Sequence, residues 1–326
     1  MIQESNNKIL ITGGAGYLGS SLVNYLESLK YNLIIFDNLS QNNHNIVKEK
    51  SKKITLVQAD INNAEKLKKH IEGVGTVIHL AGTSDGKSGE KNPKLTIKNN
   101  LTPFLNLIEE SKKNGVKKFI FTSTFGVYGH DYRDELREDL EPNPCDIYSI
   151  TKLQCEKILK EQTNDTFKAI TLRSSMIHGL SPRMRFDFIV NYLSIKALVN
   201  KKIKIINGSQ TRPLIHIKDI SKVISYFIKQ DFKYSNYECY NIHENNYSIK
   251  DIADIISKRL KNIEIEYVNS MKKENSFILN SDKIKFNYDL KFGYDLKYGI
   301  NQILNHYKNK SNFNFKDVKY YNGKLD

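Results

Sequence analysis

Six short segments in the first half of the chain are continuously apolar, with few polar residues interrupting them. They are residues 8–14, 32–38, 54–60, 76–82, 118–124 and 168–174. Successive side chains of a strand point to opposite faces of its sheet, so a continuous apolar run is typical of a strand that is buried on both faces. The pattern therefore predicts a parallel sheet that is covered by helices on both sides.

Longer amphipathic segments separate these strands and predict helices at 21–30, 101–115 and 148–162, with Gly115 as a helix stop signal. The alternation of strands and helices predicts an α/β fold of the Rossmann type, with a doubly wound parallel sheet.

The rhythm changes after about residue 175. Further helices are predicted at 186–199, 248–260 and 298–308, while 214–230 and 237–243 are expected to return to the sheet layer. We therefore expect a nucleotide-binding domain formed by 1–175 and about 212–243, and a smaller, discontinuous α/β C-terminal substrate domain formed by 176–211 and 244–326.

The charge of the chain is strongly positive, with 50 Lys and Arg against 36 Asp and Glu and a net charge of +14. The lysines are spread along the whole chain, which disfavours a nucleic-acid partner, whereas a positive field suits a nucleoside diphosphate. The chain has no 18-residue apolar run, and residues 1–8 are too polar for a signal peptide, so we expect a cytoplasmic protein without a membrane partner. Its three scattered cysteines predict neither a disulfide framework nor a metal site.

The first predicted strand runs into the sequence TGGAGYLGSS, which places Gly13, Gly16 and Gly19 three residues apart. In a strand–loop–helix context, such glycines allow a tight turn, the approach of a pyrophosphate to the backbone, and close helix packing. The alternative is a plain glycine-rich turn between a strand and a helix.

Asp37 ends the second predicted strand, 18 residues after Gly19. A carboxylate at this point accepts hydrogen bonds from the 2′-hydroxyl of an adenosine ribose and repels a 2′-phosphate. No arginine follows within DNLSQNN, so we expect NAD as the cofactor in preference to NADP. Asp60 and Ile61, after the third strand, are expected near the adenine, with a strand-end cap as the alternative for Asp60.

Tyr148 and Lys152 lie one helical turn apart in DIYSITK, after Pro144. A nearby ammonium stabilises a phenolate, as a general base in hydride transfer requires, although an ordinary solvated pair is the alternative. Ser123 or Thr124, after the fifth strand, is a candidate third partner that would hydrogen-bond the same substrate oxygen.

These motifs occur in the order TGGAGYLG, Asp37-Asn38, Asp60-Ile61, HLAG (79–82), Asn100, STFGVYG (123–129), Tyr148-x-x-x-Lys152, LR (172–173) and RPLIHIKDI (212–220). The series resembles the extended short-chain dehydrogenase/reductases, in particular the NAD-dependent epimerase/dehydratase family that acts on nucleoside-diphosphate sugars. The resemblance implies a catalytic set of Thr124, Tyr148 and Lys152, and homodimerisation through helices near 100–113 and 148–162.

The resemblance also implies the residues that bind NAD and the sugar nucleotide. The expected cofactor contacts are Gly13, Gly16, Tyr17, Leu18, Gly19, Asp37, Asn38, Asp60, Ile61, Leu80, Ala81, Gly82, Asn100, Ser123, Tyr148 and Lys152. The expected substrate contacts are Thr83, Thr124 and Arg212, with Arg212 on the diphosphate.

Departures from the family pattern bear on the activity. The sugar 4,6-dehydratases of the family carry an Asp-Glu pair directly after the threonine, where this chain has Phe125-Gly126, and the cysteine of the 3,5-epimerase/reductases is absent. Met176 and His178 stand where relatives commonly have Asn and Tyr. His178 is either a packed core residue or a second acid/base.

Arg183 and Arg185 follow this segment and are candidates to clamp a substrate phosphate, with a structural role as the alternative.

Together these features predict an NAD-dependent enzyme that oxidises C4 of a nucleoside-diphosphate sugar, with a sugar-nucleotide 4-epimerase as the leading hypothesis. A net C4 dehydrogenase or 4-ketoreductase, acting for example on a heptose, is the alternative. A non-catalytic NAD- or RNA-binding relative is a remote third hypothesis.

Overall fold

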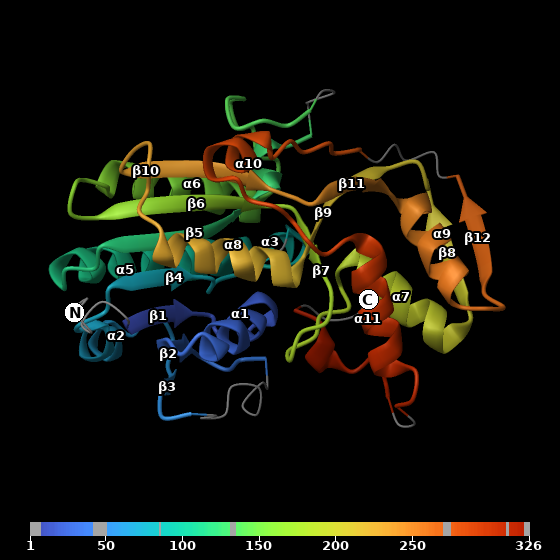
Figure 1. Ribbon diagram of the computed structural model, residues 1–326, viewed down its shortest axis with the longest axis horizontal. Coiled ribbons are helices and arrows are strands. Elements are labelled where there is room, and N and C mark those ends of the chain that lie inside the picture. Colours follow the sequence, from blue (N-terminus) through green and yellow to red (C-terminus); the bar gives the residue numbers. More distant parts are fainter. Residues whose placement is uncertain are drawn as a thin grey trace.

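A seven-stranded sheet forms the centre of the protein (Figure 1). The computed structural model describes residues 8–41, 51–84, 86–130, 135–269, 275–310 and 313–322. The strand order is β10-β6-β5-β4-β1-β2-β3, and every neighbouring pair is parallel. The strands are β1 (Lys8–Thr12), β2 (Asn32–Asp37), β3 (Ile54–Gln58), β4 (Thr76–His79), β5 (Lys118–Thr124), β6 (Lys168–Ser174) and β10 (Tyr237–Ile242). This sheet confirms the predicted Rossmann-type α/β fold.

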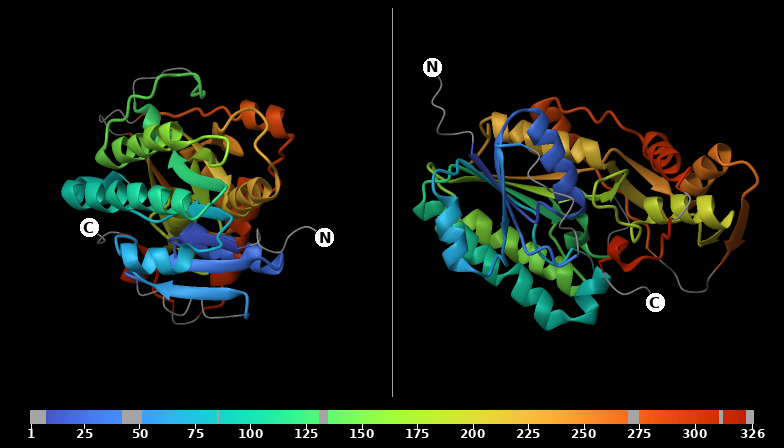
Figure 2. Two further views of the ribbon diagram at one scale, coloured as in Figure 1. Left: turned by 90° about the vertical axis from the view of Figure 1, so that its left-hand side faces the viewer. Right: turned by 90° about the horizontal axis from the view of Figure 1, so that it is seen from below.

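Helices cover both faces of this sheet, as Figure 2 shows. On one face, Ile9 and Ile11 of β1 pack in one core cluster with side chains of α1 (Tyr17–Ser28), α8 (Ile217–Lys229) and α10 (Asp282–Tyr288). On the other face, Leu10 packs in a second cluster with α2 (Ala64–Ile71), α5 (Thr102–Lys113) and α6 (Ile147–Gln162). Burial on both faces explains why the strands are continuously apolar.

The remaining strands form two small sheets outside the central one. β7 (Met176–His178), β9 (Thr211–His216) and β11 (Asn245–Ser248) make one sheet, and β8 (Lys202–Ile206) pairs with β12 (Glu264–Val268). A separate apolar cluster joins these strands to α7 (Ile189–Asn200), α9 (Ile249–Arg259) and α11 (Leu296–Tyr307). These small sheets and helices form the smaller α/β part of the predicted fold class.

The segment 214–230 differs from its predicted place in the sheet layer. Its first residues belong to β9, which pairs with β7 and β11, and the rest forms α8, which packs on the central sheet next to α1. α10, from the C-terminal third of the chain, also packs on that sheet. The domain boundaries stay a prediction.

Four further short helices lie in the described residues: the α-helices α3 (Gly86–Lys91) and α4 (Pro93–Asn100), and the 3-10 helices η2 (Phe125–Tyr128) and η3 (Val318–Tyr320). Among the helices that the structure describes, none is both long and apolar enough to cross a membrane.

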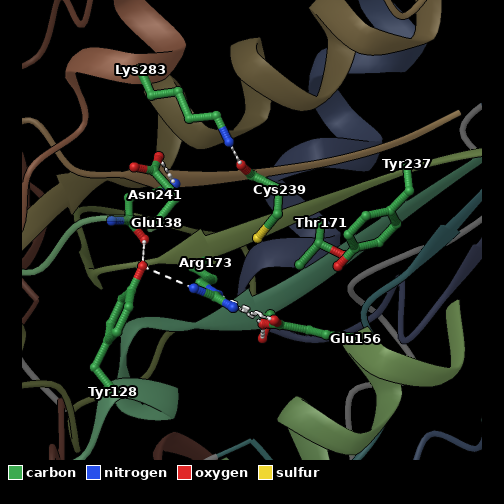
Figure 3. A network of polar contacts seen from close by, with 10 residues as sticks. Tyr128, Glu138, Glu156, Thr171, Arg173, Tyr237, Cys239, Asn241 and Lys283 are labelled. Atoms are coloured by element: carbon green, nitrogen blue, oxygen red, sulfur yellow. Dashed lines mark hydrogen bonds and ion pairs between the residues drawn. The ribbon is translucent and has the colours of Figure 1, made fainter. Parts of the chain in front are cut away.

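A buried ion pair joins α6 to β6 behind the carboxyl ends of the strands (Figure 3). Nε of Arg173 donates to both carboxylate oxygens of Glu156, at 3.2 and 3.1 Å, and Nη2 donates to Oε2 at 2.7 Å. Nη1 donates to the hydroxyl of Tyr128 at 2.9 Å, and that hydroxyl donates to Asn241 on β10. The network therefore connects η2, α6, β6 and β10, and its charges are compensated within the protein.

Replacement of Arg173 by leucine should destabilise the fold strongly, because it leaves the carboxylate of Glu156 buried without its cation. Removal of one partner of such a pair costs about 3–5 kcal/mol. Urea unfolding followed by circular dichroism measures the change in the free energy of unfolding. The exposed pair Glu109–Lys113 gives a matched control, since Glu109→Gln should leave the unfolding midpoint nearly unchanged. Equal midpoints for the two variants would contradict the buried character of the Arg173–Glu156 pair.

Candidate active site

The loop between β1 and α1 leaves no room for side chains at two of its glycines. Gly13 has a φ of +71°, and a Cβ atom on it would lie 2.7 Å from the backbone nitrogen of Ala81. A Cβ atom on Gly19 would lie 2.7 Å from the Cα atom of Gly14. The loop therefore passes close to the end of β4 and to the first turn of α1, and the N-terminus of that helix is directed at any anion bound over the loop.

Asp37 is held against this loop at the end of β2. Its Oδ2 accepts a hydrogen bond from the backbone nitrogen of Ala15 at 2.9 Å, and its Oδ1 accepts one from Leu39 at 2.8 Å. Burial raises the pKa of the carboxyl group above its usual range, while these two backbone hydrogen bonds act in the opposite direction. The two hydrogen bonds thus fix the carboxylate beside the glycine loop, where the family resemblance predicts the adenosine ribose.

Asp60 caps the turn after β3, because its Oδ1 accepts hydrogen bonds from the backbone and side-chain nitrogens of Asn62, at 2.8 and 2.7 Å. Asp60 and Ile61 also line the cavity described below, so the cap and an adenine contact are compatible.

The predicted catalytic residues come from two neighbouring elements. Thr124 ends β5, and its Oγ1 accepts a hydrogen bond from the backbone of Gly126 at 3.1 Å. Tyr148 and Lys152 lie in the first two turns of α6, which begins after the N-cap residue Asp146. The carboxylate of Asp146 accepts from the backbone of Ser149 at 2.9 Å, so α6 has a defined start and both catalytic candidates a defined place on it.

Lys152 is buried, with 7% of its surface exposed. Its Nζ donates to the carbonyl oxygen of Thr122 at 2.9 Å and lies 5.9 Å from the centre of the Tyr148 ring. Burial lowers the pKa of Lys152 to about 8, because desolvation disfavours the ammonium. A charged amine close to the phenol favours the phenolate, and this charge is lost near pH 8.

A cavity of about 760 Å³ lies over the carboxyl ends of the strands. This volume is within the range of small-molecule and cofactor sites. Nearly all of the predicted site residues line the cavity: Gly13, Gly16, Tyr17, Leu18, Gly19, Asp37, Asn38, Asp60, Ile61, Leu80, Ala81, Gly82, Thr83, Ser123, Thr124, Tyr148, Lys152, Arg183 and Arg185.

Asn100 lies one layer behind the cavity wall and connects two parts of it. Its Oδ1 accepts from the backbone of Thr83 at 2.8 Å, and its Nδ2 donates to Thr151 at 2.9 Å. The hydroxyl of Thr151 in turn donates to the carbonyl of Tyr148. Asn100 thus connects the segment after β4 to the start of α6, and it is not among the residues that line the cavity.

Arg212 also lies outside the cavity wall. Its guanidinium donates to the carbonyl of Asn275 at 2.7 Å and to Oε1 of Gln210 at 2.6 Å, and it covers the ring of Phe277 at 5.5 Å. Phe277 packs against Phe125, which does line the cavity. The contact of Arg212 with a substrate diphosphate stays a prediction.

Several cavity residues carry no local sequence signal. Ser84 accepts hydrogen bonds from Arg185 at 2.9 Å and from Asn322 at 2.6 Å, so the C-terminal part of the chain reaches the site. Within the described part of the chain, Oγ of Ser175 and Oδ1 of Asn322 are buried without a hydrogen-bond partner. Both residues line the cavity.

His178 belongs to the packing between β7 and α11 and is not among the residues that line the cavity. It is fully buried against His216, with ring centres 5.2 Å apart, and a Cβ atom on Gly299 would collide with its ring. Burial, and secondarily the neighbouring His216, lower the pKa of His178 well below its usual value, so the ring is neutral. These contacts favour the packed core residue over the second acid/base.

Comparison with known proteins finds a matching family and solved structures of the same fold. The NAD dependent epimerase/dehydratase family matches residues 9–242. A UDP-glucose 4-epimerase of Dictyostelium discoideum is 29% identical over 245 residues, which are 68% of this chain and 71% of that protein. The UDP-glucose 4-epimerase of Thermotoga maritima, solved with UDP-glucose, superposes with a TM-score of 0.83 at 24% identity, over 92% of this chain and 98% of that chain. The Thermus thermophilus UDP-glucose 4-epimerase, solved with NAD, gives a TM-score of 0.80 at 19% identity, over 93% and 99% of the two chains.

The fold and the site define an NAD-dependent enzyme with a Rossmann-type domain. The chain belongs to the NAD dependent epimerase/dehydratase family.

The residues present fit NAD as the cofactor. Gly13 and Gly19 form a cradle that a Cβ atom would fill, and Asp37 is placed for a ribose hydroxyl. Asp60 and Ile61, which are expected near the adenine, also line the cavity. Tyr148 and Lys152 line it too, and Lys152 would hold the nicotinamide ribose.

Replacement of Gly19 by alanine should weaken NAD binding about tenfold, because the added methyl group pushes α1 away from the glycine loop. Isothermal titration of the cofactor-free protein with NAD measures the affinity. Gly293→Ala is the matched control, since a Cβ atom there meets nothing closer than 3.9 Å. A Gly19→Ala protein with unchanged affinity would contradict the close packing of loop and helix.

The turnover rate should fall as the pH rises through about 8, because Lys152 then loses its proton and no longer stabilises the phenolate of Tyr148. Initial rates between pH 6 and 10 test this. In Lys152→Arg, whose guanidinium keeps its charge over this range, the residual activity should lack this decline. A wild-type rate that stays constant up to pH 10 would contradict the role of the ammonium.

Proposed function

We propose that the protein is a nucleoside-diphosphate-sugar 4-epimerase that works through a 4-keto sugar. One observation carries the proposal: Thr124, Tyr148 and Lys152 line the same cavity as the glycine loop and Asp37. A sugar bound there would meet the cofactor and a general base together. The names of the similar UDP-glucose 4-epimerases support a UDP-sugar as the first substrate to test.

The side chains have separate roles in this proposal. The phenolate of Tyr148 removes the proton of the C4 hydroxyl, and the ammonium of Lys152 stabilises that phenolate. The hydroxyl of Thr124 holds the same sugar oxygen. NAD, when bound, would accept the hydride from C4 and return it to the ketone. Tyr148 would hold the proton taken from the C4 hydroxyl and give it back to the sugar oxygen once the 4-keto sugar has turned its other face, which gives the 4-epimer.

Phe125 separates this proposal from water elimination. It follows Thr124 directly, lines the cavity, and packs edge-on against Phe277 with ring centres 5.4 Å apart. A phenyl ring neither donates nor accepts a proton, so the position lacks the acid/base group that elimination requires. We therefore do not expect the 4-keto sugar to lose water.

A net C4 dehydrogenase or 4-ketoreductase is the second candidate. Met176 lines the cavity where relatives commonly carry an asparagine, so the sugar loses a polar contact that would hold it in one place. A changed sugar position would favour release of the ketone, as in a dehydrogenase, over its reduction in the same site. In the reverse direction, a 4-ketoreductase would take up the ketone from solution.

Homodimerisation and a cytoplasmic location are further parts of the proposal. Apolar side chains are exposed on the two helices that the family pattern assigns to the dimer contact: Leu105 on α5 and Ile150 on α6. Exposed apolar groups on neighbouring helices support a contact with a second copy.

A substrate screen tests the proposed reaction. The purified protein is incubated with UDP-, GDP-, CDP- and dTDP-sugars, and the products are examined by mass spectrometry and NMR. An unchanged mass with inverted C4 is the expected result. Loss of two hydrogens would favour the dehydrogenase, and loss of water would contradict both candidates.

Tyr148→Phe should lower the turnover rate by about 10²- to 10⁴-fold, because it removes the general base. NAD binding should remain, which separates a chemical defect from a folding defect. Tyr234→Phe is a matched control, since the side chain of Tyr234 is exposed and lies outside the cavity. Full turnover in Tyr148→Phe would refute the proposed base.

A further inference from the structure

Arg183 lines the same cavity as Asp37, although it comes from the segment between β7 and α7. Its side chain is 3% exposed, and it lines the cavity together with Asp37 and Gln41. One contact is with Gln41, 142 residues earlier in the chain, whose Oε1 accepts from Nη2 of Arg183 at 3.4 Å. Among the residues that the structure describes, Nε of Arg183 is buried without a hydrogen-bond partner. The guanidinium is thus a buried cation in the wall of the cofactor cavity.

The segment that carries Arg183 is fastened to the first turn of α1. Oγ of Ser181 donates to the carbonyl of Tyr17 at 2.7 Å, and the backbone nitrogen of Arg183 donates to Oγ of Ser20 at 3.2 Å. The hydroxyl of Tyr17 donates to the carbonyl of Gly179 at 2.7 Å. These contacts hold the backbone of Arg183 next to the glycine loop, so the position of its side chain is built into the fold.

Asp37 and Arg183 act on each other electrostatically. Burial raises the pKa of Asp37, and Arg183 is among the groups that oppose this increase. Burial lowers the pKa of Arg183 to about 10, with a further decrease from Arg185 and an opposing effect of Asp187 and Asp37. Arg183 is therefore charged at neutral pH, and its charge acts on a carboxylate that lines the same cavity and would hold the ribose hydroxyls.

We infer that Asp37 and Arg183 together select the cofactor. Arg183 is placed to bind the 2′-phosphate of NADP, and the negative charge of Asp37 prevents that phosphate from binding. The carboxylate accepts from the ribose hydroxyls and repels a phosphate, which makes NAD the preferred cofactor. A guanidinium next to the ribose would pair with the phosphate oxygens once the carboxylate charge is removed. The inference concerns the cofactor alone and does not depend on which sugar is the substrate.

The position of Arg183 distinguishes it from Arg185, two residues later. Nε and Nη2 of Arg185 are both paired with the carboxylate of Asp187, and Nη1 donates to Ser84 at 2.9 Å. Asp187 therefore compensates the charge of Arg185. Arg183 contacts Gln41 instead, four residues after Asp37, and Asp37 acts on its charge electrostatically.

A set of four proteins tests the inference by direct binding: the wild type, Asp37→Asn, Arg183→Gln and the double variant. Each is titrated calorimetrically with adenosine 2′,5′-bisphosphate, and each is also incubated with equimolar NAD and NADP. After gel filtration and denaturation, chromatography of the released nucleotides gives the retained ratio. Asp37→Asn should bind the bisphosphate at least about tenfold more tightly than the wild type, since a hydrogen bond to a charged group has this value. Arg183→Gln in the same background should abolish that gain.

Two comparisons make the test decisive. Arg185→Gln in the Asp37→Asn background removes the same charge from the same segment and should preserve the gain. Arg183→Gln alone should move the retained ratio further toward NAD, and it serves as the test if Asp37→Asn does not fold. The inference is overturned if the double variant keeps the gain, or if Arg183→Gln weakens NAD and NADP equally, as a contact with their shared pyrophosphate would.

Discussion

The carboxyl ends of the parallel strands lie at one edge of the central sheet, and the whole candidate site depends on this arrangement. β1 ends at the glycine loop, β2 at Asp37 and β5 at Thr124. Because parallel strands all run in one direction, residues that are far apart in the sequence reach the same cavity. The helix that follows a strand begins at this edge too, so α1 presents its positive N-terminus where a pyrophosphate would bind.

Two buried cations near this edge have different surroundings and therefore different consequences. The guanidinium of Arg173 is paired with Glu156 and connects α6 to β6, so it serves the structure behind the site. Ser123, next to Thr124, donates to the same carboxylate. Lys152 donates to a backbone carbonyl rather than to a carboxylate. Its burial lowers its pKa to about 8, so it can gain or lose a proton close to neutral pH. A buried charge without full compensation is a general mark of a candidate functional residue, and Lys152 meets this description.

The elements that the sequence predicted well are those whose side chains are buried on both faces or along one helical stripe. All seven strands of the central sheet lie within predicted segments, and so do most of α5 and α6. The strands of the two small sheets carried a weaker signal: β7 is three residues long, and β8 alternates between exposed and buried residues. Their partners lie far away in the sequence, so the pairing of β8 with β12 and of β7 with β9 comes from tertiary contacts.

The sequence by itself determined the glycine loop, Asp37 and the Tyr148–Lys152 pair, because each depends on local spacing: a tight turn, the end of a strand, and one turn of a helix. Only the tertiary structure decided which side chains from elsewhere complete the cavity. It brought Arg183 into contact with Gln41 in the cavity that Asp37 also lines, set Arg212 behind Phe125 and Phe277, and buried His178 against His216. The contact partner of a charged loop residue cannot be read from its neighbours in the sequence, because the packing of segments that are distant along the chain decides it.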